Sequence, residues 1–215
     1  MNKTLVFSYL TLRKIVGLLG ISFPVILILG SIIAGGCNEI QSSISEYYHT
    51  IMRDIFVGVL CIVAFFLFAY NGYEKADKIA GSLASFFALG IAFFPTTIQL
   101  PINACSIEPA NQNKLAGSFH YIFAALLFLT LAYFSLYLFP KSRGYKTKEK
   151  IMRNRIYKTC GYIMLTCIVL LALYFLFFEN SELSKYKPVF FLEGASLWAF
   201  GISWLIKGEF LLKDK

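Results

Sequence analysis

Residues 15–36 read IVGLLGISFPVILILGSIIAGG, a run of apolar and small side chains without a charge. A helix needs about 20 mainly apolar residues to cross the hydrocarbon core of a bilayer, which is about 30 Å thick. Arg13 and Lys14 before the run and Cys37 after it resemble a secretory or lipoprotein signal. The run is longer than the roughly 7 to 15 apolar residues of such a signal, so we expect a retained transmembrane helix.

Five more runs with few or no charges follow along the 215 residues, of which 58% are hydrophobic and 15% are charged. A soluble domain carries about a quarter charged residues, so this composition is typical of a membrane protein and not of a soluble domain. The sequence predicts a single all-α domain, residues 1–215, built as a bundle of six transmembrane helices. The expected helices lie near residues 15–35, 53–71, 77–95, 117–139, 157–178 and 188–206.

Lysine and arginine are divided unequally between the two sides that six helices define. With a cytoplasmic N-terminus, the basic loop at residues 141–158 is also cytoplasmic, and cytoplasmic loops carry the excess of these residues. We therefore expect both termini in the cytoplasm. A nucleic-acid partner is the alternative explanation of the loop. Attraction to anionic headgroups, about 1 kcal/mol for each basic residue, explains it better, so we expect membrane lipids and no nucleic acid as partners.

Five cysteines occur at positions 37, 61, 105, 160 and 167, without the close spacing of a redox or zinc motif. Cys37 and Cys105 fall in the external loops of this topology, where disulfides persist, and the other three fall within helices. The sequence leaves two alternatives open for this pair: a disulfide or two unpaired thiols.

Ionisable residues inside membrane spans are costly and usually mark a functional site. Asp54, His120 and Glu193 fall in the external halves of three different expected helices. Neighbouring polar residues precede or open the second helix, and we expect the whole set to converge in one polar cavity. The residues of this predicted cluster are Ser45, His49, Arg53, Asp54, His120 and Glu193.

The functional interpretation of this cluster is acid and base catalysis by Asp54, His120 and Glu193. The same three side chains are candidate zinc ligands, since zinc takes nitrogen and oxygen donors where thiolates are absent. Arg53 would bind an anion, while Ser45 and His49 would supply polar contacts to a ligand. The alternative is structural: interfacial histidines, an Asp54 carboxylate at a helix N-terminus, and a Glu193 paired with Arg53 across the bundle.

Four stretches resemble a bacterial family of six-helix membrane proteins that is catalogued as a domain of unknown function. They are SISEYYHTIMRDIFVG (43–58), FPT (94–96), FHY (119–121) and FGISWLIKG (200–208). The resemblance implies a multi-pass protein of the bacterial cytoplasmic membrane and carries no catalytic assignment. A more distant likeness, through the six-helix plan and the Ser-rich segment before the second helix, is to the eukaryotic autophagy modulators and GPI-anchor lipid remodelling proteins.

Two functions from different classes fit these observations. In the first, the external cluster forms a cavity that binds a lipid-like substrate and hydrolyses or transfers it. In the second, the protein is a small transporter or a non-catalytic membrane scaffold whose buried polar residues hold the helices together. Loss of activity or loss of stability in variants of His120 and Glu193 separates the two.

Overall fold

The protein is all-α in the part of the chain that the structure describes. The computed structural model describes residues 9–70, 72, 74–98, 105, 113–142 and 147–212. These ranges contain six α-helices and no strand, which confirms the expected all-α fold. The helices are α1 (Tyr9–Gly35), α2 (Arg53–Phe68), α3 (Lys75–Phe93), α4 (Lys114–Tyr133), α5 (Lys148–Phe177) and α6 (Pro188–Lys207). Both chain ends and residues 143–146 of the basic loop lie outside the described residues.

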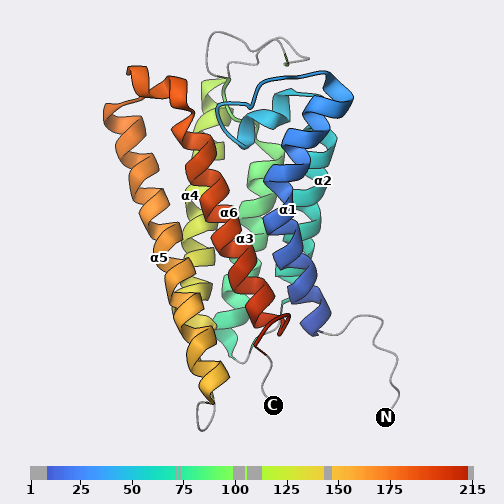
Figure 1. Ribbon diagram of the computed structural model, residues 1–215, viewed down its shortest axis with the longest axis vertical. Coiled ribbons are helices and arrows are strands. Elements are labelled where there is room, and N and C mark those ends of the chain that lie inside the picture. Colours follow the sequence, from blue (N-terminus) through green and yellow to red (C-terminus); the bar gives the residue numbers. More distant parts are fainter. Residues whose placement is uncertain are drawn as a thin grey trace.

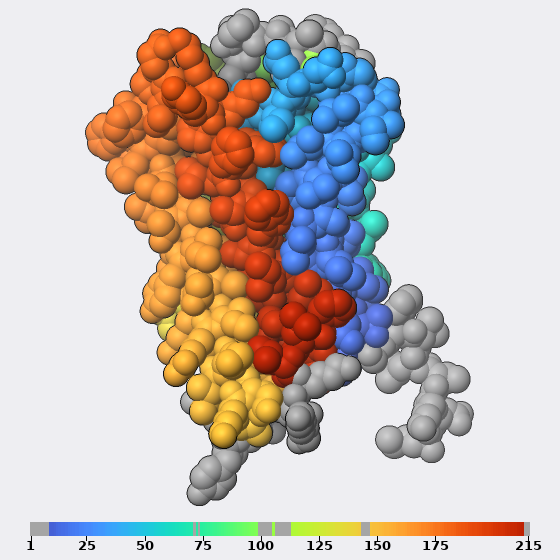
Figure 2. Space-filling view, viewed as in Figure 1, coloured from blue at the N-terminus to red at the C-terminus, as the bar shows by residue number. Residues whose placement is uncertain are grey.

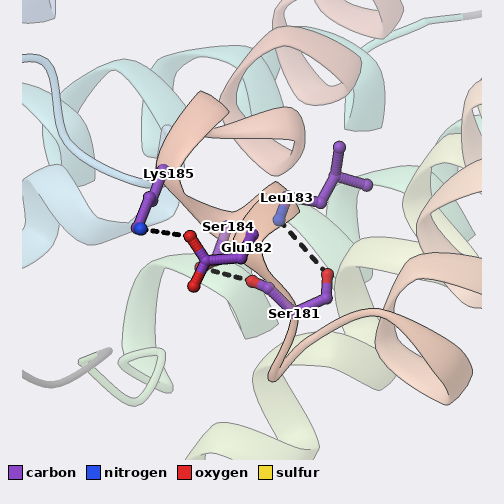
Figure 3. A network of polar contacts seen from close by, with 5 residues as sticks. All are labelled: Ser181, Glu182, Leu183, Ser184 and Lys185. Atoms are coloured by element: carbon purple, nitrogen blue, oxygen red, sulfur yellow. Dashed lines mark hydrogen bonds and ion pairs between the residues drawn. The ribbon is translucent and has the colours of Figure 1, made fainter.

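Three short helical segments connect or extend these helices. They are the 3-10 helices η1 (Ser45–His49) and η3 (Glu182–Tyr186) and the π-helix η2 (Phe134–Leu138), which continues α4. The η3 connection from α5 to α6 is held by its own polar side chains (Figure 3). The Ser181 hydroxyl accepts a hydrogen bond from the Leu183 amide at 3.3 Å, and Lys185 pairs with Glu182.

The helices run alternately up and down (Figure 1), and their packing closes a ring. Each helix packs against the next in the chain, and α6 packs against α1. We call the end of the bundle where α1 begins and α6 finishes the terminal end, and the opposite end the cap end. The connections from α2 to α3, from η2 to α5 and from α5 to α6 are short, and consecutive helices joined by short loops are antiparallel neighbours. The connection after α1 is longer and includes η1.

Five of the six helical regions are long and apolar enough to cross a membrane: α1, α3, α4 with η2, α5 and α6. The sixth, α2, has 16 residues, and at a rise of 1.5 Å per residue it is about 24 Å long. Large apolar side chains cover the outer surface, with Leu176 72% and Phe65 67% exposed. The bundle therefore has the make-up of an integral membrane protein.

Two helices begin well before the expected residues. The first starts at Tyr9 instead of residue 15, and α5 starts at Lys148 instead of residue 157. The start of α5 is capped by the Thr147 hydroxyl, which accepts a hydrogen bond from the Lys150 amide at 3.1 Å. Lysine, arginine and glutamate are good helix formers, so a helix continues past the end of an apolar run into charged sequence.

Part of the basic segment stabilises the terminal end of the bundle. The ammonium groups of Lys150 and Lys207 both donate to the Phe139 carbonyl, at 3.0 and 3.4 Å. The Arg153 guanidinium donates to the Leu212 carbonyl at 2.6 Å. Arg153 and Lys207 are buried. These three cations therefore have structural contacts in addition to any role at the membrane surface.

Helices α1 and α6 approach each other closely at glycines. A Cβ atom added at Gly201 would lie 2.7 Å from the Gly17 carbonyl oxygen, and one added at Gly17 would lie 2.8 Å from the Gly201 oxygen. Small residues at such positions let two helix backbones come together in a membrane, where close packing drives helix association. Figure 2 shows α6, in red, seated between α1 and α5.

Candidate functional site

The polar residues of the cap end are gathered by the segment between α1 and α2, residues 37–52, which we call the cap. Gly36 ends α1 with φ 63°, a backbone conformation that suits glycine, and turns the chain over the bundle (Figure 1). The cap contains η1, in which Ser45, Tyr47 and His49 are buried. Burial also raises the pKa of the Tyr47 phenol.

A disulfide ties the cap to the connection between α3 and α4. It joins Cys37 to Cys105, whose Cα atoms are 5.5 Å apart. Of the two alternatives that the sequence left open, a disulfide and two unpaired thiols, the structure has the disulfide. The other three cysteines are not bridged, with Cys160 and Cys167 buried.

Glu193 on α6 binds the backbone at the start of η1. Its carboxylate accepts a hydrogen bond from the Ile44 amide at 2.7 Å and another from the Ser45 amide. The first amides of a helix have no partner within that helix, so this carboxylate acts as a cap supplied by a different helix. The amide of Phe190 donates to the Ser42 carbonyl at 3.1 Å and adds a second link between α6 and the cap. Glu193 therefore fixes the cap on the bundle.

His49 and His120 hold the segment that follows α3. The ring nitrogen Nε2 of His49 donates to the Thr96 carbonyl at 2.8 Å, and Nδ1 of His120 donates to the Phe94 carbonyl at 2.7 Å. A carbonyl oxygen can only accept, so each of these nitrogens carries a proton. Both rings are buried, at 5% and 1% exposure.

The second nitrogen of His120 is the notable atom of this cluster. In the neutral ring, a proton on Nδ1 leaves Nε2 with a lone pair. This Nε2 atom is buried and has no hydrogen-bond partner among the described residues. The backbone of Ile91 in α3 lies beside the same ring and, like that of Phe94, favours its protonated form. A histidine that is oriented by a backbone carbonyl through one nitrogen and presents the other as an acceptor has the arrangement of a general base or a ligand-binding group.

Arg53 and Asp54 lie differently from the other members of the predicted cluster. The Arg53 guanidinium donates to the Tyr48 hydroxyl at 3.1 Å and lies 4.8 Å from the centre of the Tyr48 ring. Asp54 is exposed on α2, whereas His120 is buried and Glu193 is partly buried. Successive residues of a helix point about 100° apart, so Arg53 and Asp54 cannot both face the bundle interior.

The expected zinc ligands His120, Asp54 and Glu193 are not brought together as one group. In the part of the chain that the structure describes, which includes all three, no group of three or more His, Cys, Asp or Glu side chains is placed to hold a metal ion. The physical reason is that Asp54 faces outward and the Glu193 carboxylate is occupied by backbone amides. The sequence also offered a pairing of Glu193 with Arg53. In the structure, the Glu193 carboxylate binds the backbone amides of Ile44 and Ser45 instead.

The sequence did not single out the contacts of Thr96 and Tyr121. The Tyr121 hydroxyl lies 3.3 Å from Oγ1 of Thr96 and 3.2 Å from Oγ1 of Thr97. Pro95 directly after α3 is the sequence signal that could have indicated this site, because a proline ends a helix and leaves its last carbonyls in need of donors. The two histidines donate to the carbonyls of Phe94, the C-terminal cap residue of α3, and of Thr96, just beyond it.

Replacing Glu193 by glutamine is expected to lower the free energy of unfolding by about 1 kcal/mol, because a carboxamide has one acceptor oxygen where the carboxyl group has two, and one of the two backbone amides would lose its hydrogen bond. The measurement is the thermal unfolding of detergent-purified protein. Glu39→Gln is the matched control, since Glu39 is an exposed glutamate of the same cap. Equal unfolding temperatures for the two variants would contradict the capping role.

The fold and the site together define a class: a helical membrane-type bundle with a disulfide-tied cap and buried histidines. No family model, no curated protein and no solved structure matches the chain. The resemblance to a bacterial six-helix family stays a prediction. What the protein does must therefore follow from its own residues.

Proposed function

We propose that the protein crosses the bacterial cytoplasmic membrane six times, with both termini in the cytoplasm, and uses His120 at its external cap end to bind and turn over a lipid-like substrate. Basic residues support the orientation, because the terminal end carries most of them. Those of the described residues at this end are Arg13, Lys14, Lys75, Lys78, Lys141, Lys148, Lys150, Arg153, Arg155, Lys158 and Lys207. At about 24 Å, α2 completes a sixth crossing with Arg53 extended toward the headgroups and slight local thinning of the bilayer.

The observation that carries the chemical proposal is the Nε2 atom of His120, buried and without a hydrogen-bond partner among the described residues. An unsatisfied buried acceptor is unfavourable, so a donor from a ligand would stabilise it. The substrate class that fits is an amphiphile with a hydroxyl group close to its headgroup, since the site lies at one end of an apolar bundle.

As a general base, Nε2 would take the proton of a hydroxyl group or of water while its oxygen attacks an ester carbonyl. The protonated ring would then return that proton to the departing alcohol, which balances the transfer. Phe94 holds Nδ1 and so fixes the ring, while His49 positions the neighbouring backbone at Thr96. Glu193 and Asp54 have no catalytic role in this scheme.

The structural alternative, a non-catalytic scaffold, has its own support. The Glu193 carboxylate and the His49 ring both bind backbone groups of the protein itself. A cap that is held in this way needs no substrate. The two functions predict different effects for the loss of Nε2 of His120: the enzyme would lose lipid binding and turnover, and the scaffold would lose neither.

His120→Asn tests the proposal, because an asparagine amide can replace Nδ1 as donor to Phe94 but has nothing in place of Nε2. We expect this variant to fold with an unfolding temperature near that of the wild type and to lose both retained lipid and turnover. His49→Gln is the matched control, since a glutamine amide can replace the Nε2 donor to Thr96. This variant should keep both the retained lipid and the turnover.

The measurement uses detergent-purified protein incubated with a bacterial polar lipid extract, followed by mass spectrometry of retained lipids and of products. If His120→Asn retains and converts the same lipids as His49→Gln, the functional proposal is wrong. A variant that loses only thermal stability would favour the scaffold.

A further inference from the structure

An open groove of 390 Å³ runs between α3 and α4 in the half of the bundle near the terminal end. Its walls include Ala76, Ile79 and Leu83 from α3 and Leu126, Thr130 and Tyr133 from α4. The volume falls within the range of roughly 300 to 1,000 Å³ that is usual for small-molecule sites. This groove is distant along the chain and in the bundle from the cap.

The groove follows from residue spacing on two antiparallel helices. Its lining residues recur every three or four positions, which places them on one face of each helix. Ala76 is small and leaves a hollow on the α3 side. Thr130 donates its hydroxyl to the Leu126 carbonyl at 2.7 Å, so its polar atom is satisfied within α4 and the lining is apolar.

The length of the groove suits part of one hydrocarbon chain. From Ala76 to Leu83 the helix rises about 10 Å, which is about a third of the hydrocarbon core of a bilayer. Ile79 is 59% exposed and Leu83 is 45% exposed, so the groove opens to the outside of the bundle, where the bilayer would be.

The terminal end of the groove has a cationic rim. The Lys141 ammonium lies 2.7 Å from Glu74, and this hydrogen bond raises the pKa of the lysine, which keeps it charged. Asp77 and the groove residue Tyr133 lie near enough to raise the pKa of Lys141 further when they are ionised. Lys75 and Lys78 are exposed on the first turns of α3. Lysines therefore outnumber the exposed carboxylate at this rim.

Aromatic side chains mark the same level. The rings of Tyr133 and Tyr137 lie 5.5 Å apart, and both are exposed. Exposed tyrosines are enriched at the headgroup level of membranes. The rim is thus placed where a lipid phosphate would lie when its chain extends toward the middle of the bilayer.

We infer that this groove binds one acyl chain of an anionic glycerophospholipid whose phosphate contacts the Lys141 ammonium. An ammonium group has three donors, of which Glu74 takes one, so phosphate oxygens can share it without displacing the carboxylate. The exposed Lys141–Glu74 pair contributes little to stability, so sharing the ammonium with a phosphate costs little. The positive charge at the rim favours an anionic headgroup, and the apolar walls of the groove favour an acyl chain.

The test uses detergent-purified protein and native mass spectrometry with phosphatidylglycerol and phosphatidylcholine of identical chains. Wild-type protein is expected to bind phosphatidylglycerol at least about fivefold more tightly, the effect of one basic residue near an anionic lipid. Lys141→Gln should remove about fivefold of that preference. Lys158→Gln, an exposed lysine on α5, is its control and should leave the preference unchanged.

Ala76→Phe should fill the groove and weaken binding of both lipids at least fivefold, whereas Ala125→Phe, at an exposed alanine of α4 outside the groove, should not. Ala76→Leu serves the same purpose if the phenylalanine variant does not fold. Equal binding of the two lipids by the wild type, or equal binding by the Ala76 and Ala125 variants, would overturn the inference. His120→Asn should keep the phosphatidylglycerol preference, which separates this groove from the cap site.

Discussion

Removing the disulfide between Cys37 and Cys105 is expected to lower the free energy of unfolding by up to about 4 kcal/mol. The two cysteines are 68 residues apart in sequence, and in the chain-entropy model a closed loop of that length restricts the unfolded chain by this amount. The loop contains α2 and α3, so the bridge ties both helices and the cap to the end of α1. Urea unfolding of detergent-purified Cys37→Ser/Cys105→Ser protein measures the effect.

Cys61→Ser is the control for this pair, because Cys61 is an unbridged cysteine of α2. It should unfold close to the wild type. The same bridge also reports on orientation, since disulfides persist outside the cytoplasm and are reduced within it. Protein alkylated in intact cells should have Cys37 and Cys105 protected, and rapid labelling of both would contradict an external cap.

Replacing Gly201 by alanine should destabilise the protein by about 3 kcal/mol. The added methyl group would lie 2.7 Å from the Gly17 oxygen and 2.9 Å from the Ile21 amide nitrogen, and these backbone atoms cannot rotate away. Helices α1 and α6 would have to separate, at the upper end of the usual penalty for overpacking. Thermal unfolding of the purified variant gives the measurement.

Gly58→Ala is the matched control for this substitution. Gly58 also lies within a helix, but a Cβ atom added there would meet no atom within 4 Å. Alanine is favoured over glycine in a helix by up to about 1 kcal/mol, so this variant should be unchanged or slightly more stable. Similar unfolding temperatures for the two alanine variants would show that the α1–α6 contact is not as close as described.

Apolar runs predicted the bounds of a helix accurately where the apolar sequence extends over the whole helix. The sixth helix, expected at residues 188–206, occupies Pro188–Lys207. The start of α5 was missed by nine positions because charged residues that favour helix carry no apolar signal. The short length of α2 also follows from its sequence, where the charge-free run itself ends near Tyr70.

The sequence predicted which side chains belong to the candidate site, but not the backbone groups that they bind. His120 and Glu193 were predicted as site residues because ionisable groups within membrane spans are costly and usually mark a site. His49 was grouped with them, but its burial was not predicted, since an interfacial position was the alternative. Their partners are the Ile44 amide and the carbonyls of Phe94 and Thr96, as described above. Backbone groups have no side-chain signature of their own, so apart from Pro95 after α3 the residue pattern could not show which of them these side chains bind.

The contact between the first and last helices of the ring has a consequence for biosynthesis. The ribosome makes α1 first, but the helix that covers its glycine face, α6, emerges last. Until then the Gly17 surface of α1 must face lipid or an insertion factor. The disulfide, in contrast, needs only the first three helices and the connection after α3. Assembly thus falls into two stages, an early covalent tether and a late closure that waits for the whole chain.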